Sequence, residues 1–141
     1  MKTFVVLAVS IALVGILFCT MVMAAPSMPS DLQMVQPDPS LPKELSAFFG
    51  KWEGLGGNTD WFLIVEKIDE EKASVYLWAN SSLKYMVPQG WNRCEALVTK
   101  QGGKYYLQFR DSYANYRLTV KGQSLDMDAK GVGSARLRRV P

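Results

Sequence analysis

The chain has 141 residues, with 16 Lys and Arg against 13 Asp and Glu, and it contains no histidine. This near balance of charge gives no reason to expect nucleic acid or an anionic membrane surface as a partner. The lack of histidine excludes His-based catalytic triads, Cys–His dyads and nearly all zinc and non-haem iron sites. We therefore expect a non-enzymatic protein with no catalytic residues, no metal site and no cofactor.

The N-terminus has the three parts of a secretory signal peptide in order. Lys2 is the positive start, Phe4–Cys19 is an apolar run, and small residues follow at Ala24 and Ala25. We predict a signal peptide over residues 1–24, with a cut one residue later as a close alternative. The other alternative is a retained membrane anchor, but Pro26, Pro29 and the small residues favour cleavage. A secreted or periplasmic protein with no stable membrane insertion after cleavage is expected.

After the cut, residues 25–43 hold most of the prolines, together with Ser and Asp and few large apolar side chains. This composition predicts a tail or linker. Residues 44–141 are long enough for one domain with its own core. Cys19 leaves with the signal peptide, so Cys94 stands alone and no intramolecular disulfide can form. Cys94 alternates with apolar residues, and we expect it in the core.

Beyond Leu45–Phe49, which can form one helical turn, apolar residues recur with the period of two that is typical of β-strands. Eight strands are predicted, at about 49–54, 61–68, 73–80, 91–100, 103–110, 114–121, 124–129 and 132–139. Short connections between consecutive strands predict an antiparallel meander. Eight strands can close into an up-and-down barrel, which leaves no exposed sheet edge. The fold class is therefore all-β, with a small open sandwich as the alternative.

The hairpins predict a strand register. A turn at Gly122–Gln123 puts three apolar pairs on one face: Val120 with Leu125, Leu118 with Met127, and Tyr116 with Ala129. On the other face Arg117 would meet Asp128 as a surface ion pair. Another turn is expected at Gln101–Gly102 or one residue pair later, and a three-residue turn at Ala129–Gly131 is expected to close the last hairpin.

Aromatic side chains supply the candidate ligand site. Five of them fall on the predicted inner face, and a sixth lies beside the long loop from Ser81 to Gly90: Tyr76, Trp78, Tyr105, Phe109, Tyr116 and Trp91. They would line a pocket for a small hydrophobic or amphipathic ligand, with the loop as a lid. The alternative is that these side chains simply fill the barrel.

Strands 61–68 and 73–80 are apolar on both faces. We predict one face from Trp61, Leu63, Val65, Tyr76 and Trp78, and the other from Phe62, Ile64, Ile68, Val75 and Leu77. Something must cover the outer face: the proline-rich tail, the Leu45–Phe49 turn or another subunit. This gives the alternative function, a cell-envelope protein-interaction or inhibitor module. Its partner, or a second copy in a homodimer, would bind through these two strands.

The segment Phe49–Trp52 contains a G-x-W before the first strand, and Ala135–Arg138 bears arginines on the last strand. Together they resemble the lipocalin and wider calycin pattern. The resemblance implies that Trp52 lies at the closed end of an eight-stranded barrel and that a late arginine, Arg136 or Arg138, packs across it. Both positions would be structural.

Two strands carry a second resemblance. Phe48–Gly54 reads Phe-x-Gly-x-Trp-x-Gly, and Leu63–Ile68 reads Leu-x-Val-Glu-x-Ile. In this the chain is similar to small exported bacterial β-barrel proteins of unknown function. The resemblance implies the same barrel and an exported location.

Overall fold

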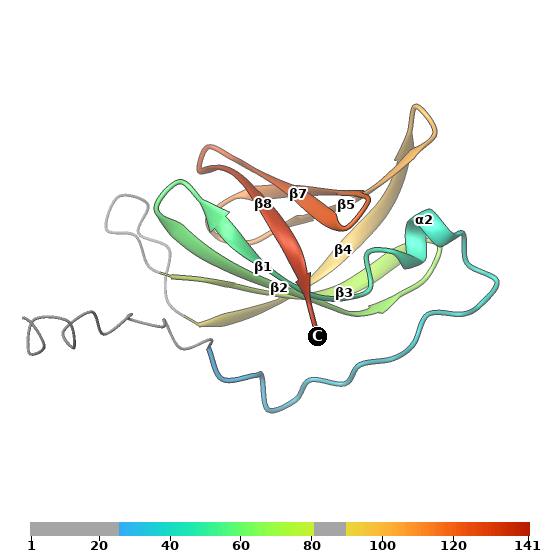
Figure 1. Cartoon of the computed structure of the whole chain (residues 1–141), viewed down its shortest axis with the longest axis horizontal. Helices are drawn as coiled ribbons and strands as arrows, with labels where there is room; N and C mark the ends of the chain where they lie inside the picture. Colours follow the sequence, from blue (N-terminus) through green and yellow to red (C-terminus); the bar gives the residue numbers. More distant parts are fainter. Residues whose placement is uncertain (1–25, 81–89) are drawn as a thin grey trace, which may run out of the picture.

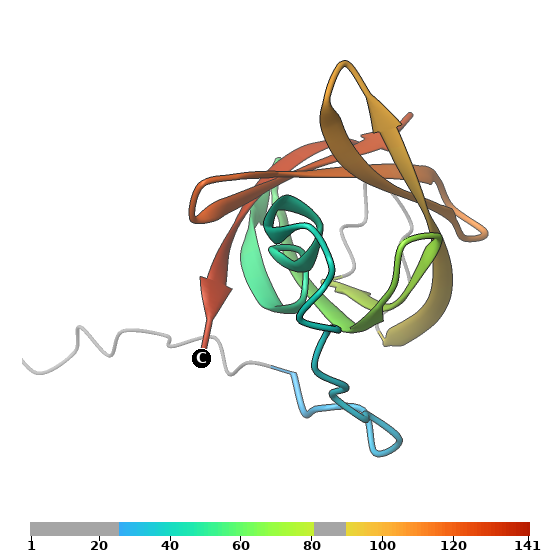
Figure 2. The same cartoon turned by 90° about the vertical axis from the view of Figure 1, so that its right-hand side faces the viewer.

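The structure is a computed structural model that describes residues 26–80 and 90–141. One short helix, α2 (Lys43–Ser46), precedes eight strands: β1 (Gly50–Gly56), β2 (Thr59–Ile68), β3 (Lys72–Ala79), β4 (Trp91–Gln101), β5 (Lys104–Arg110), β6 (Asn115–Lys121), β7 (Ser124–Lys130) and β8 (Gly133–Val140). Each strand pairs with the next and β8 pairs with β1, so the sheet closes into an antiparallel barrel (Figures 1 and 2). The predicted all-β up-and-down barrel is confirmed, and its form is compatible with a calycin-like fold. The predicted signal peptide lies outside the described residues.

The predicted register of the β6–β7 hairpin is confirmed. The three apolar pairs face each other as expected: Val120 with Leu125, Leu118 with Met127, and Tyr116 with Ala129. The predicted Arg117–Asp128 ion pair is wrong, although the two residues are cross-strand partners. Arg117 instead donates from Nη2 to Oε1 of Gln101 at 2.7 Å, and its guanidinium lies 3.8 Å from the ring centroid of Tyr106. An aromatic face and an amide thus outcompete a carboxylate at this wet surface.

The other two predicted turns form where glycine permits them. The β4–β5 turn is at Gly102–Gly103, with φ of 57° and 77°, which is the two-residue geometry that suits twisted strands. The β7–β8 turn also has three residues but lies one residue later than predicted, because Ala129 pairs with Gly133 and Gly131 has a φ of 89°. Leu125 therefore pairs with Leu137, and both stay on the inner face as predicted. Both turns keep the apolar faces of the paired strands on the inside.

The β2–β3 pair departs from its predicted faces. The register shifts between Val65 and Lys67, which makes Glu66 the extra residue of a β-bulge. Beyond the bulge Ile64 is paired with Tyr76, and Phe62 with Trp78. Without the bulge, Tyr76 would pair with Val65 and Trp78 with Leu63, and both would face inward. The bulge turns both of them outward, so their predicted place on the inner face is wrong.

The inner face of this pair is consequently made by other side chains. Trp61, Leu63 and Val65 of β2 are buried in the core with Val75, Leu77 and Ala79 of β3. Ile68 also joins the core, because the bulge lets β2 present apolar residues inward on both sides of Glu66. Val75, Leu77 and Ile68 therefore leave the outer face that the sequence pattern assigned to them.

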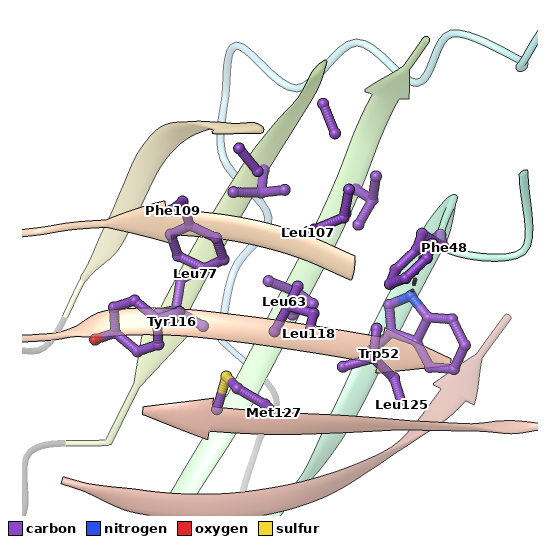
Figure 3. Close-up of a cluster of buried hydrophobic side chains, with 14 of the residues drawn as sticks. Phe48, Trp52, Leu63, Leu77, Leu107, Phe109, Tyr116, Leu118, Leu125 and Met127 are labelled. Carbon is purple, nitrogen blue, oxygen red and sulfur yellow. Dashed lines mark hydrogen bonds between the residues drawn. The ribbon is translucent and has the colours of Figure 1, made fainter. Parts of the chain in front are cut away.

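One end of the barrel is closed by the segment that leads into β1. In the end-on view α2 lies across this opening (Figure 2). Leu45, Phe48 and Trp52 are each almost completely buried there, and Trp52 Nε1 donates to the carbonyl oxygen of Phe48 at 2.9 Å (Figure 3). Trp52 thus lies at the closed end, as the lipocalin resemblance implied.

The arginine that packs across Trp52 is Arg139, with its guanidinium 4.2 Å from the ring centroid. The expected residues were Arg136 and Arg138, and that expectation is wrong. Their side chains are 71% and 79% exposed, and each forms an ion pair on the outside of the barrel. Leu137 points into the core from between them. Arg139 lies on the same face as Leu137 and so reaches Trp52.

The proline-rich segment runs along the outside of the barrel before it reaches α2 (Figure 1). Its backbone is tied to the bulge, because the Val35 amide donates to the Glu66 carbonyl oxygen at 2.8 Å. Ile64 and Tyr76, which face outward, are only 1% and 3% exposed. The proline-rich tail was one of the candidate covers of this outer face, and it lies against the part of the face around Glu66 and Tyr76. No helix in the described ranges is long and apolar enough to span a membrane.

Candidate functional site

The six aromatic residues of the predicted site divide into two groups. Tyr105, Phe109 and Tyr116 face the barrel interior, whereas Tyr76, Trp78 and Trp91 lie on its outer surface. The barrel wall separates the groups. The single inner pocket that the sequence pattern suggested therefore does not form.

The inward aromatics pack against each other. The Phe109 and Tyr116 rings are stacked with centroids 4.8 Å apart (Figure 3). Trp61 meets Tyr116 edge-on at 6.4 Å. The Tyr116 hydroxyl donates to Oδ2 of Asp111 at 3.1 Å. Burial, and then the charge of Asp111, raises the pKa of Tyr116 well above its ordinary value. Tyr105 is only half-buried, under the Lys100 ammonium. These contacts are those of a packed core.

The middle of the barrel is filled by apolar side chains (Figure 3). Those with almost no exposed surface include Leu63, Leu107, Leu118, Leu125, Met127 and Leu137. Cys94, which was predicted in the core, packs against it but is only half-buried, and burial raises the pKa of its thiol.

A cavity of about 230 Å³ lies at the open end, between the β1–β2 and β7–β8 turns, with Thr59, Trp61 and Met127 in its wall. Pockets for drug-sized ligands usually measure roughly 300 to 1,000 Å³. This cavity is below that range. The barrel interior is thus a weak candidate for the ligand site.

A larger cleft of about 370 Å³ lies on the outer surface over β1, β2 and β3. The strand register determines which side chains form the wall of this cleft. One row of successive cross-strand partners runs Arg138, Glu53, Phe62, Trp78 and Trp91, from β8 to β4. In the neighbouring row Leu55 is paired with Asp60. All of these except Trp91 line the cleft, so a mixed aromatic and charged surface is built from side chains that share the outer face.

The floor of this outer cleft is apolar. The Phe62 and Trp78 rings meet edge to face with centroids 5.3 Å apart. Leu55 beside them is 65% exposed, which is a high value for a leucine on a strand. The rim is polar: Arg138 Nη2 donates to Oε1 of Glu53 at 2.7 Å, and Asp60 Oδ2 accepts from Asn80 Nδ2 at 3.4 Å. Exposed aromatic and aliphatic groups ringed by hydrogen-bonding groups are typical of a binding surface.

The proline-rich segment occupies the neighbouring part of the same face. Trp91 Nε1 donates to the Ser27 carbonyl oxygen at 2.7 Å, and the Trp91 ring meets Tyr76 edge-on at 6.4 Å. Burial, and then Asp31 of the segment, raises the pKa of Tyr76. Tyr76 and Trp91 are therefore engaged by the chain itself. Of the predicted site residues, only Trp78 contributes to the outer cleft.

Glu66 fastens this segment to the barrel. Its side chain is 3% exposed and accepts hydrogen bonds from Ser74 Oγ at 2.8 Å and from the Gln33 amide at 3.2 Å, and it pairs with Arg93. Burial alone would raise the pKa of Glu66, but these donors outweigh it and hold the pKa below its ordinary value. A buried carboxylate is tolerated here because its oxygens are hydrogen-bonded.

A second open groove, of about 500 Å³, lies over β6, β7 and β8. Its lining is mainly polar and charged, and Asp126 there pairs with Arg136 at 2.8 Å and with Lys121 at 2.6 Å. The described residues hold no group of three or more potential metal ligands. This groove is therefore a solvated, ion-paired surface and a poorer candidate than the aromatic cleft.

The sequence reasoning missed Glu53, Leu55, Asp60 and Arg138 as site residues. The apolar outer residue Phe62 was the available signal, but the partners from β1 and β8 follow only from barrel closure. The predicted lid loop lies almost entirely outside the described residues. Comparison of the chain with protein-family models, curated proteins and solved structures gave no match. The likeness to lipocalins thus rests on the barrel and on its Trp52–Arg139 contact.

Proposed function

We propose that this chain is an exported, non-enzymatic binding protein, secreted or periplasmic, which takes a small hydrophobic or amphipathic ligand in its outer cleft. The observation that carries the proposal is an apolar surface inside a concavity of about 370 Å³, made by the exposed Leu55 and the half-buried Phe62 and Trp78. That volume is in the range of small-molecule sites. The signal-peptide pattern of residues 1–24 supports export.

The outer cleft is favoured over the barrel interior on packing grounds. Leu63, Leu118 and Leu125 are completely buried in the middle of the barrel, so a ligand there would have to displace the core. Displacing close-packed side chains costs several kcal/mol, whereas the cleft loses only water when a ligand enters. The polar rim of Glu53 and Asp60 would orient an amphipathic molecule.

The test is a fluorescence titration with the neutral apolar probe N-phenyl-1-naphthylamine. Leu55→Ala is expected to weaken probe binding by roughly five- to tenfold, because it removes an apolar wall of the cleft. The matched control is Leu97→Ala, since Leu97 is 59% exposed on the outer face but outside the cleft. If the probe fails to bind, or if the two variants weaken it equally, the proposal is wrong.

A protein partner is the second candidate function, and one observation favours it. The chain's own proline-rich segment lies across the adjoining part of the β2–β3 outer face, with Trp91 bound to a backbone carbonyl of Ser27. A surface that holds one extended polypeptide is suited to another. Native mass spectrometry of the protein from its own host separates the cases. A bound small molecule supports the first proposal, and a partner protein or a homodimer supports the second.

A further inference from the structure

The charges of the outer cleft do not cancel. Glu53 is neutralised by Arg138, which donates to it from Nη2 at 2.7 Å and from Nε at 3.1 Å. Asp60 is different, because its carboxylate bonds only to the side-chain amide of Asn80 and, in the described ranges, to no cation. Among the residues that the structure describes, the cleft thus presents one carboxylate that no cation pairs with.

The cations around the cleft are held by other carboxylates. Arg136 is the cross-strand partner of Leu55, which places it at the edge of the cleft. Its Nε donates to Oδ1 of Asp126 at 2.8 Å, on the side of β8 away from the cleft. Arg138 is engaged by Glu53. Neither guanidinium is therefore available to compensate Asp60 without breaking an existing pair.

The uncompensated carboxylate lies beside an electron-rich aromatic surface. Asp60 and Phe62 are two residues apart on β2 and face outward together, so their Cα atoms are roughly 7 Å apart. Trp78 is the cross-strand partner of Phe62. Indole is the best aromatic partner for a cation, and a nearby carboxylate adds direct attraction. One ligand head group can reach both.

We propose that the ligand of the outer cleft is an organic cation: an amine or quaternary ammonium group that sits between Asp60 and Trp78, joined to an apolar part that covers Leu55 and Phe62. This inference rests on the proposed function and specifies its ligand class. The apolar floor supplies affinity, and Asp60 selects the charge.

Competition between three probes with ten-carbon chains and different head groups tests the charge class. Decyltrimethylammonium, 1-decanol and decanoate are each titrated against bound N-phenyl-1-naphthylamine. The cation is expected to displace the probe at a roughly five- to tenfold lower concentration than the alcohol, with decanoate weakest. This preference should shrink as salt is raised, because the cleft is open to solvent. The salt dependence needs no variant.

Asp60→Asn is expected to abolish the preference for the cation while leaving displacement by 1-decanol unchanged. Asp128→Asn is the matched control, since Asp128 is an exposed carboxylate on the outer face of β7. Equal displacement by all three probes, or a preference for decanoate, overturns the charge class but leaves the proposed function standing. If the naphthylamine probe does not bind at all, both proposals fail.

Discussion

Arg139 connects Trp52, at the closed end of the barrel, to the segment after α2 that covers this end. It is the cross-strand partner of Trp52, and its guanidinium lies 4.2 Å from the Trp52 ring centroid. The same guanidinium donates from Nη1 to the Phe49 carbonyl oxygen and from Nη2 to that of Ala47, each at 2.6 Å. Both carbonyls belong to the turn that leads from α2 into β1. One side chain from the last strand therefore fixes the segment that plugs the barrel.

Arg139→Ala should destabilise the fold by about 2 to 4 kcal/mol, because two charge-assisted hydrogen bonds and a cation–π contact are lost together. Urea unfolding followed by tryptophan fluorescence measures the change. Arg139→Lys should recover only part of the loss, since lysine keeps the charge but lacks the planar fork. Arg136→Ala is the control, and it should cost less than about 1 kcal/mol. Equal losses for the alanine variants would contradict this role.

Arg139 could have been predicted from the sequence as the arginine that packs across Trp52. The resemblance to lipocalins implied a late arginine across Trp52, and Arg136 and Arg138 were chosen. Strand alternation already placed Leu137 inside the barrel, and two residues further along the same face is Arg139. Alternation also predicted the β6–β7 register, because a two-residue turn leaves no freedom in which side chains face each other.

The bulge at Glu66 is the feature that the sequence pattern did not reveal. It inserts one residue into β2. The β3 residues that pair with the part of β2 before Glu66 are therefore shifted by one position, so that those expected to face inward face outward. Tyr76 and Trp78 moved from the predicted pocket to the outer surface for this reason alone. A glutamate between Val65 and Lys67 looks like an ordinary outward residue. Its buried hydrogen bonds to Ser74 and to the proline-rich segment are long-range contacts that no local pattern encodes.

Glu66→Gln should loosen the proline-rich segment, because the amide cannot accept from three donors as the carboxylate does. We expect the Val35 amide, which bonds to the Glu66 carbonyl oxygen, to exchange its hydrogen roughly tenfold faster. Hydrogen exchange read by NMR measures this. Glu95→Gln is the matched control, because the pair that Glu95 forms with Lys72 is exposed. Unchanged protection of Val35 in Glu66→Gln would refute the anchoring role.

The same contact should depend on pH. The folded-state pKa of Glu66 is below the ordinary 4.5, since the hydrogen bonds from Ser74, Gln33 and Arg93 outweigh the opposing effect of burial. A carboxyl with a lowered pKa contributes stability that is fully present above the ordinary value and lost as pH falls through the folded value. Val35 protection should therefore be full above the ordinary value of 4.5 and should fall as the pH drops below it in the native protein. It should be much less sensitive to pH in Glu66→Gln, and parallel loss in both would contradict the prediction.

Asp126 should titrate with a pKa of about 2, because it accepts hydrogen bonds first from Arg136 and then from Lys121. Its stabilising effect is present above the ordinary value of 3.8 and is lost as pH falls toward 2. Arg136→Ala should raise the pKa, and NMR titration of the Asp126 carboxyl carbon measures it. Lys130→Ala is a suitable control, since Lys130 forms no ion pair within the described ranges. A pKa that stays at about 2 in Arg136→Ala would contradict the dominant role of that arginine.

Leu118→Ala should cost about 3 kcal/mol, because Leu118 is fully buried in the filled middle of the barrel and its truncation leaves a cavity. Chemical denaturation measures the loss, with Leu97→Ala expected to stay within about 0.5 kcal/mol. The affinity for N-phenyl-1-naphthylamine should remain unchanged in Leu118→Ala. Weaker binding of the probe in this variant would indicate a site inside the barrel instead of the outer cleft.

Export should produce a chain that begins at Ala25. Intact mass of the protein recovered outside the cytoplasm is the measurement, and a mass that includes residues 1–24 would contradict it. Ala24→Leu should abolish the cut after Ala24, because signal peptidase requires a small residue before the cut, and leave only the alternative cut after Ala25, whereas Met23→Leu should keep the original cut. The carbonyl bound by Trp91 belongs to Ser27. Cleavage after Ala24 thus leaves the contacts of the proline-rich segment in place, so the processed chain should protect the Val35 amide as strongly as the uncut one.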